Sequence, residues 1–236
     1  MSIPYSIKKS KRAKLMRIVV SHEKVEVIMP LKMSLTTAQQ FVTAKQAWIE
    51  TTLAKLRHKV QAAPTLAPSS YQQGSLIPYQ GQHYPLVLIS SAMKKPQLTF
   101  ANAFQLAIPQ ARYAEFTSEA IRAHIIAWCK TEIKRKVQDV VHLHAPQFQL
   151  YPRTVRIKAQ KSRWGSCGPN NDVNINWLLI LAPPQILEYV VVHELCHIRH
   201  KNHSAVFWAL VAAHLPAYQE CRDWLKQNGT RLMQGL

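Results

Sequence analysis

The stretch Tyr189-Val-Val-Val-His193-Glu194-Leu-Cys-His197 decides the fold. Read as a helix, it places His193 and His197 four residues apart on one face, where both imidazoles can reach a single ion. A rigid pair of this kind suits the distances and angles of zinc without movement of the backbone. Glu194 lies beside the first ligand and is placed to hold and deprotonate a water, as in the His-Glu-x-x-His motif.

A third ligand is expected from beyond this helix. His203 is the stronger candidate, because Asn202 can adopt a turn that ends the helix and returns the next residue over the metal. His200, on the same helical face as the first two histidines, is the alternative. Glu220 and Asp223 are candidates for an extra ligand or for an acceptor to a ligand histidine, with a surface salt bridge as their more usual role.

The competing interpretation is a chance match among eleven histidines that are satisfied within the core. The apolar run Ile186–Val192 predicts a buried helix, and burying two histidines and a glutamate there costs several kcal/mol unless they have partners. A metal is the simplest partner, so we expect one Zn²⁺ per chain, with manganese or another divalent ion as the alternative. An open fourth position for water would make this site catalytic.

Length and composition set broad limits. The 236 residues, 47% of them hydrophobic, suffice for one large domain or two small ones. No apolar run is long enough to cross a membrane, and the N-terminus lacks the apolar core of a secretory signal, so we expect a cytoplasmic protein without a membrane partner. The cysteines have no Cys-x-x-Cys spacing, which suits reduced thiols; they are Cys129, Cys167, Cys196 and Cys221.

The charge is strongly positive, with 30 Lys and Arg against 12 Asp and Glu, a net +18. Such a field attracts polyanions, so nucleic acid, nucleotide phosphates and acidic protein segments are candidate partners. The alternative is that the positive charge serves only solubility or non-specific attraction. The basic segment Lys8–Arg17 is the candidate docking site for nucleic acid.

Residues 1–112 are expected to form a β-rich domain with one helix. A hairpin is predicted over 18–20 and 25–28, and then a helix capped by Thr36 or Thr37 whose apolar positions repeat near the 3.6 period. Residues 62–75 have a loop composition. Short strands follow, with Gly81 and Asn102 in their turns; they are expected at 76–79, 83–89, 97–100 and 104–108.

Residues 113–236 are expected to form the domain with the metal helix. Ser118 should cap a long helix that the segment His142–Pro146 stops. His142 and His144 have the wrong spacing for one helical face, so we expect surface or cap histidines rather than metal ligands. Strands at 153–159 and 173–177 are expected to pair as a hairpin, and a helix capped by Ser204 follows the metal motif. A last helix should run from Tyr218 to Asn228 and end at Gly229. The fold class is therefore α+β.

Four side chains of the predicted hairpin region could donate to an oxyanion or a phosphate oxygen near the metal. They could equally anchor the loop in which they lie. These residues are Lys161, Arg163, Asn174 and Asn176.

Several motifs resemble, in order and spacing, those of the YgjP-like family of metal-dependent hydrolases. They are Lys161-Ser-Arg-Trp-Gly-Ser-Cys167, Asn174-Ile-Asn-Trp177, Ala182-Pro-Pro184, Tyr189–His197 and Asn202-His-Ser204 with Phe207-Trp208, and the resemblance also covers the N-terminal half. It implies a zincin-like domain, related to the SprT and WLM metallopeptidases, with His193, His197 and His203 as ligands and Glu194 as base. The metzincin class is disfavoured, because His200 stands where its motif has glycine and no Met-turn follows.

Three functions are consistent with these patterns. The first is a zinc-dependent metallopeptidase acting on peptides or proteins. The second is a metal-dependent nucleoside triphosphate pyrophosphatase or phosphohydrolase, suggested by the charge together with Lys161 and Arg163. The third is a DNA-associated, SprT-like protease. The sequence leaves the oligomeric state open.

Overall fold

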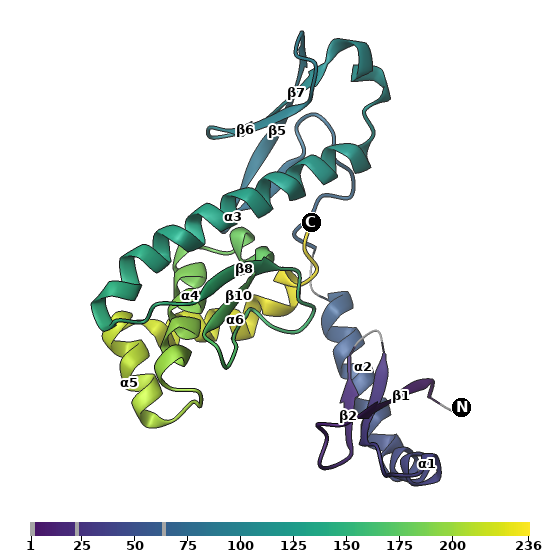
Figure 1. Cartoon of the computed structure of the whole chain (residues 1–236). Helices are drawn as coiled ribbons and strands as arrows, with labels where there is room; N and C mark the ends of the chain where they lie inside the picture. The colour runs from purple at the N-terminus through teal and green to yellow at the C-terminus, as the bar shows by residue number, and fades with distance from the viewer. Residues whose placement is uncertain (1–2, 22–23, 63–64) are drawn as a thin grey trace. The chain divides into compact units, whose positions relative to one another are not determined.

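The computed structural model describes residues 3–21, 24–62 and 65–236 (Figure 1). The chain forms two compact units, Met1–Pro64 and Thr65–Leu236. The sequence placed a boundary after residue 112 instead. The difference arises because the strands between residues 76 and 109 pack on the long helix of the second unit, where they share one hydrophobic core with it.

The first unit is a three-stranded sheet with two helices. The strands β1 (Tyr5–Ser10), β2 (Arg17–Val20) and β3 (Val25–Pro30) lie in the order β1-β3-β2. The predicted hairpin of β2 and β3 is confirmed, and β1 adds a parallel partner to β3. Buried side chains alternate along β3, and its inward face packs on the helices.

The prediction of one helix in this unit is wrong, because two helices are present. They are α1 (Leu35–Ala44) and α2 (Gln46–Ala62), with Lys45 as the non-helical C-cap of α1. Ser34, rather than Thr36 or Thr37, caps α1, and its hydroxyl accepts a hydrogen bond from the Thr37 amide at 3.1 Å.

The second unit begins with a four-stranded sheet. Its strands β4 (Leu76–Tyr79), β5 (Gln82–Ser91), β6 (Gln97–Phe100) and β7 (Phe104–Pro109) lie in the order β4-β5-β7-β6. The turn at Gln80 and Gly81 has φ angles of 49° and 81°, which favour glycine. A Cβ on Gly81 would lie 2.8 Å from Pro183 Cγ, so this turn closes tightly under the start of the metal-motif helix.

A short η1 helix (Gln110–Glu115) leads to the long helix α3 (Ser118–Phe148), which runs along the second unit in Figure 1. Thr117 caps it, not Ser118, whose hydroxyl instead accepts a hydrogen bond from the Tyr71 amide at 2.8 Å. Aromatic rings from the sheet gather on Trp128 of α3 with the edge and tilted contacts of a packed core; they are Tyr79, Phe100 and Phe104.

The C-terminal end of α3 differs from the sequence prediction. Pro146 does not stop the helix, which continues to Phe148 and ends at Gln149 in the left-handed conformation. Proline removes one backbone N–H donor, and the helix continues only two residues beyond it. His144 lies on the buried face of this helix, while His142 is exposed as predicted.

Three short strands precede the metal-motif helix: β8 (Thr154–Lys158), β9 (Gly165–Cys167) and β10 (Asp172–Asn176). The predicted hairpin of the two outer segments is wrong, because β8 and β10 pair in parallel. The antiparallel partner of β10 is β9, a strand of three residues within the loop between them. This arrangement brings the turn of β9 and β10 beside the metal motif.

Helices complete the unit. A short η2 helix (Trp177–Leu181) leads into α4 (Pro184–Arg199), followed by α5 (Ala205–His214) and α6 (Tyr218–Leu232). Gly229 does not end α6 as predicted. It lies inside the helix, and a Cβ there would contact the Trp164 ring at 3.4 Å. The α+β class is confirmed.

None of the helices in the described part of the chain combines the length and the apolar composition that a membrane span requires.

Candidate metal centre

Helix α4 carries the metal motif through the core. Pro184 begins the helix, where a missing N–H is tolerated. Most of its side chains are buried, including Val191, Val192 and Leu195. The helix ends at Arg199, and His200 follows in an extended conformation. This ending turns the chain so that His203 comes back over the helix.

Three imidazoles converge at the end of α4. His193, His197 and His203 each offer one ring nitrogen, and these nitrogens lie within 4.8 Å of one another. The Nε2 atoms of His193 and His203 are 3.1 Å apart. The structure thus gathers the predicted set with His203, whereas the cluster does not include the alternative, His200.

The protonation states suit a cation. Burial, with the adjacent His197 and His203, lowers the pKa of His193 to about 3, and burial also lowers the pKa of His197. The His197 ring bonds the His200 carbonyl through Nδ1 at 2.9 Å, which leaves its Nε2 lone pair for another partner. Nδ1 of His193 is buried without a hydrogen-bond partner. Three imidazole nitrogens this close together are a donor set that zinc binds in proteins, so these residues fit a divalent ion.

Aromatic side chains of α5 hold the three rings, and an arginine of α6 supports them from behind. Phe207 is fully buried and contacts all of them, with ring centroids 4.5 to 5.0 Å away. Trp208 stacks on His203 at 5.5 Å, and the Arg222 guanidinium lies 4.9 Å from the centre of the Trp208 ring. The exposed His203 therefore has a rigid support, because its neighbours are packed aromatic rings.

Glu194 is 5% exposed and lies under strand β9. A Cβ at Gly165 would stand 2.6 Å from the Glu194 carboxylate oxygen, so only glycine permits this approach. Burial raises the pKa of Glu194 to about 7, although the Arg163 charge and a hydrogen bond from the Cys167 backbone act in the opposite direction. A carboxyl group in this environment can both take and release a proton near neutral pH.

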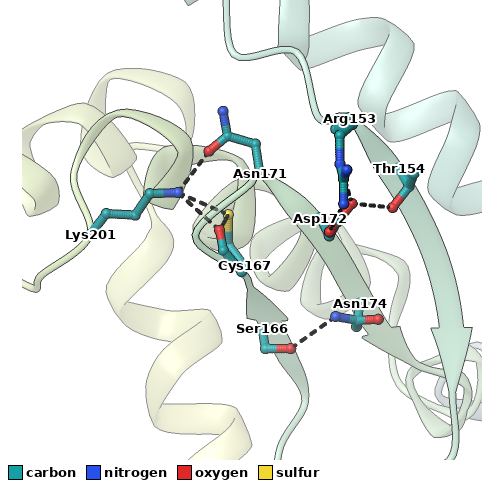
Figure 2. Close-up of polar contacts among 9 residues, drawn as sticks. Arg153, Thr154, Ser166, Cys167, Asn171, Asp172, Asn174 and Lys201 are labelled. Carbon is teal, nitrogen blue, oxygen red and sulfur yellow. Dashed lines mark hydrogen bonds and ion pairs between the residues drawn. The ribbon is translucent and has the colours of Figure 1, made fainter.

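Lys201 joins the loop that carries His203 to the turn between β9 and β10 (Figure 2). Its ammonium donates to Asn171 Oδ1 at 2.7 Å and to the Gly168 carbonyl at 3.2 Å, and it lies 3.7 Å from Cys167 Sγ. Asp172 anchors the same turn to β8 through Arg153 and Thr154. The loop and the strand over Glu194 therefore share one set of polar contacts.

The four predicted donors have different placements. The buried Asn176 amide donates to the carbonyls of Gln160 and Arg163 at 2.7 and 2.9 Å, so it anchors the loop. Asn174 donates to Ser166 across the two strands, at 3.3 Å. Arg163 is exposed with its charge acting on Glu194, and Lys161 is also exposed. The charge of Arg163 thus acts on the buried carboxyl group.

Other sequence candidates lie outside the histidine cluster. Neither Glu220 nor Asp223 belongs to it. The prediction for His144 was wrong, because the buried ring bonds Glu188 at 2.8 Å and contacts His214 at 3.2 Å. A cavity of about 320 Å³ near the N-terminal half of α4, lined in part by Glu188 and Glu220, does not contain the three ligand candidates.

Sequence reasoning did not identify several residues that shape the centre. Gly165, Lys201 and Arg222 act on it through contacts between distant segments, which no spacing in the chain indicates. Phe207 was recognised as an apolar helix residue, and its position four residues after His203 was the available signal.

Comparison with known protein families gives one match: the model of the YgjP-like metallopeptidase domain covers residues 14–228. The matched range contains the histidine cluster, Glu194 and the strands beside them. A comparison with curated proteins finds no match.

Proposed function

This chain belongs to the YgjP-like family of metallopeptidase domains, and we propose that it is a zinc-dependent peptidase. The family match supports a metal-dependent hydrolase. The observation that carries the finer proposal is the convergence of three imidazole nitrogens within 4.8 Å beside a buried carboxyl group. Peptide-bond hydrolysis needs a polarised carbonyl, an activated water and a proton carrier, and this arrangement supports all three.

His193, His197 and His203 would hold one Zn²⁺, or another divalent ion, with three protein ligands. When bound in this way, zinc supplies a Lewis acid and lowers the pKa of a water in its open position. Glu194 is the general base that takes the proton of the attacking water and returns it to the leaving amine. Arg163, exposed near Glu194, is placed to stabilise negative charge on the substrate.

The decisive test compares Glu194→Gln with the wild-type chain on a mixed panel of unstructured peptides. We expect one zinc per chain in both proteins, measured by elemental analysis, and loss of turnover in the variant. Glu115→Gln is the matched control, because it removes an exposed carboxylate that lies outside the metal motif. Unchanged peptide hydrolysis by Glu194→Gln would contradict the assignment.

A second candidate is a nucleoside triphosphate phosphohydrolase. The specific observation in its favour is the pair of arginines near the cluster, Arg163 with its charge on Glu194 and Arg222 with its charge on His193. Guanidinium groups bind phosphate oxygens well. Phosphate release from nucleotides, without cleavage of any peptide in the panel, would favour this function over the first.

We also propose a reducing compartment such as the cytoplasm as the location. All four cysteines are free thiols, and three of them are buried. Mass spectrometry of protein alkylated directly in cell extract would detect a disulfide that contradicts this proposal.

A further inference from the structure

The first unit carries a dense positive charge. Residues 1–64 contain twelve Lys and Arg against three Asp and Glu, so little more than a quarter of the chain holds half of its net charge. Every Lys and Arg of this unit whose side chain the structure describes is exposed. Charge at this density attracts polyanions over distances of about a Debye length, roughly 8–10 Å at physiological salt.

An aromatic hollow lies on the same unit. Strand β2 and the junction of α1 and α2 border an open hollow of about 280 Å³, lined by Ile18, Phe41, Lys45 and Trp48. Trp48 is 51% exposed, although tryptophan is usually mostly buried. Lys45 lines the same hollow, so a cation stands in the wall of a concave aromatic surface.

We propose that this hollow binds single-stranded nucleic acid, with an unpaired base stacked on Trp48 and an adjacent phosphate held by Lys45. Base stacking on an aromatic side chain combined with a basic surface is the usual means of binding single strands. The bases of a duplex are stacked on each other and present only their edges, so a duplex cannot use Trp48 in this way.

The shape of the site argues against an anionic membrane as the partner. Membrane-surface binding uses a protruding apolar face, whereas Trp48 and Phe41 line a hollow. The volume lies just below the range of about 300–1,000 Å³ for small-molecule pockets, which suits one planar base rather than an extended apolar segment. This proposal is independent of the peptidase assignment. Together they would bring the second unit to substrates on nucleic acid, as the SprT-like hypothesis expects.

The test is fluorescence anisotropy of the full chain with labelled oligo-dT, oligo-rU and a duplex of equal length, at several KCl concentrations. We expect tighter binding to single strands than to the duplex, and comparing the two oligomers separates DNA from RNA. Trp48→Ala should weaken binding about 5- to 100-fold without changing the salt dependence. Lys45→Ala should reduce the slope of log affinity against log salt by about 0.7.

Matched controls separate the site from general charge and aromatic content. Lys94→Ala removes an exposed lysine of the second unit, and Tyr113→Ala an exposed aromatic ring; both should bind like the wild type. Trp48→Phe should keep most of the affinity, and circular dichroism checks that each variant is folded. Equal binding by Trp48→Ala, tighter binding to the duplex, or binding to phosphatidylserine vesicles without binding to single strands would each overturn the proposal.

Discussion

Gly165 lies directly against Glu194, and a Cβ at residue 165 would stand 2.6 Å from both Cγ and Oε1 of the glutamate. Gly165→Ala must therefore move either β9 or the carboxyl group. We expect turnover to fall about 100-fold, because a displacement of about 1 Å at a reacting group has an effect of that size. The zinc content should stay at one per chain, since the histidines are not displaced.

Gly168→Ala is the matched control for this prediction. The added Cβ would meet its nearest neighbour, the Asp172 carbonyl oxygen, at 3.6 Å, an ordinary van der Waals contact. Its activity should remain close to that of the wild type. Turnover rates and zinc contents of both variants, measured by steady-state kinetics and elemental analysis, test this prediction. Full activity in Gly165→Ala would contradict it, because Glu194 would then tolerate displacement.

The contacts of Lys201 predict a change in metal affinity. Lys201→Ala should release the loop before His203 and weaken zinc binding about 10- to 100-fold, the usual effect of losing a group that orients a ligand. Competition with a chromogenic chelator measures the affinity. Lys226→Ala, an exposed lysine of α6, is the control for lost charge.

Asn171 provides a second variant for the same contact. Its φ angle is 60°, a left-handed conformation that glycine adopts readily. Asn171→Gly therefore keeps the backbone conformation while it removes the side-chain acceptor for Lys201. The effects of Asn171→Gly and Lys201→Ala on zinc affinity should not add, because both variants break one interaction. Full additivity would mean that the two residues act separately.

The sequence predicted the metal motif because its parts are local. His193, Glu194 and His197 share one helix, and His203 follows after a short turn, so spacing alone predicts that they meet. The hairpin of β2 and β3 was predictable for the same reason, since short connections join antiparallel strands.

The errors concern distant contacts. Alternation along residues 154–158 identifies a strand and its faces but not the direction of its partner, so the parallel pairing of β8 with β10 was missed. Lys201 and Asn171 are 30 residues apart, and nothing in either segment indicates the other. His144 was expected at the surface because its spacing from His142 does not suit one helical face, but it lies on the buried face of α3, which continues past Pro146.

Asp172 predicts an acid-sensitive contribution to stability. Hydrogen bonds from Arg153 and Thr154 lower the pKa of its carboxyl group from 3.8 to about 2. The folded-state pKa is depressed, so the contribution is fully present above pH 3.8 and is lost as the pH falls toward 2. Asp172→Asn should lower the urea midpoint at pH 7 and have less effect near pH 2. The exposed Asp223→Asn is the control, and an equal effect of Asp172→Asn at both pH values would contradict this account.

His214 predicts a second pH dependence in a higher range. Burial, with the adjacent His144, lowers the pKa of His214 to about 4, against 6.5 for a free imidazole. The unfolded chain therefore takes up a proton between pH 6.5 and 4 that the folded chain excludes, and the free energy of unfolding should decrease as the pH falls through this window. His214→Phe, which can keep the edge contact with Phe148, should flatten that decrease. Urea unfolding followed by tryptophan fluorescence, with chelator present so that metal binding does not contribute, gives the comparison. His83→Phe removes an exposed imidazole and should keep the wild-type slope; the same slope in His214→Phe would place the proton uptake elsewhere.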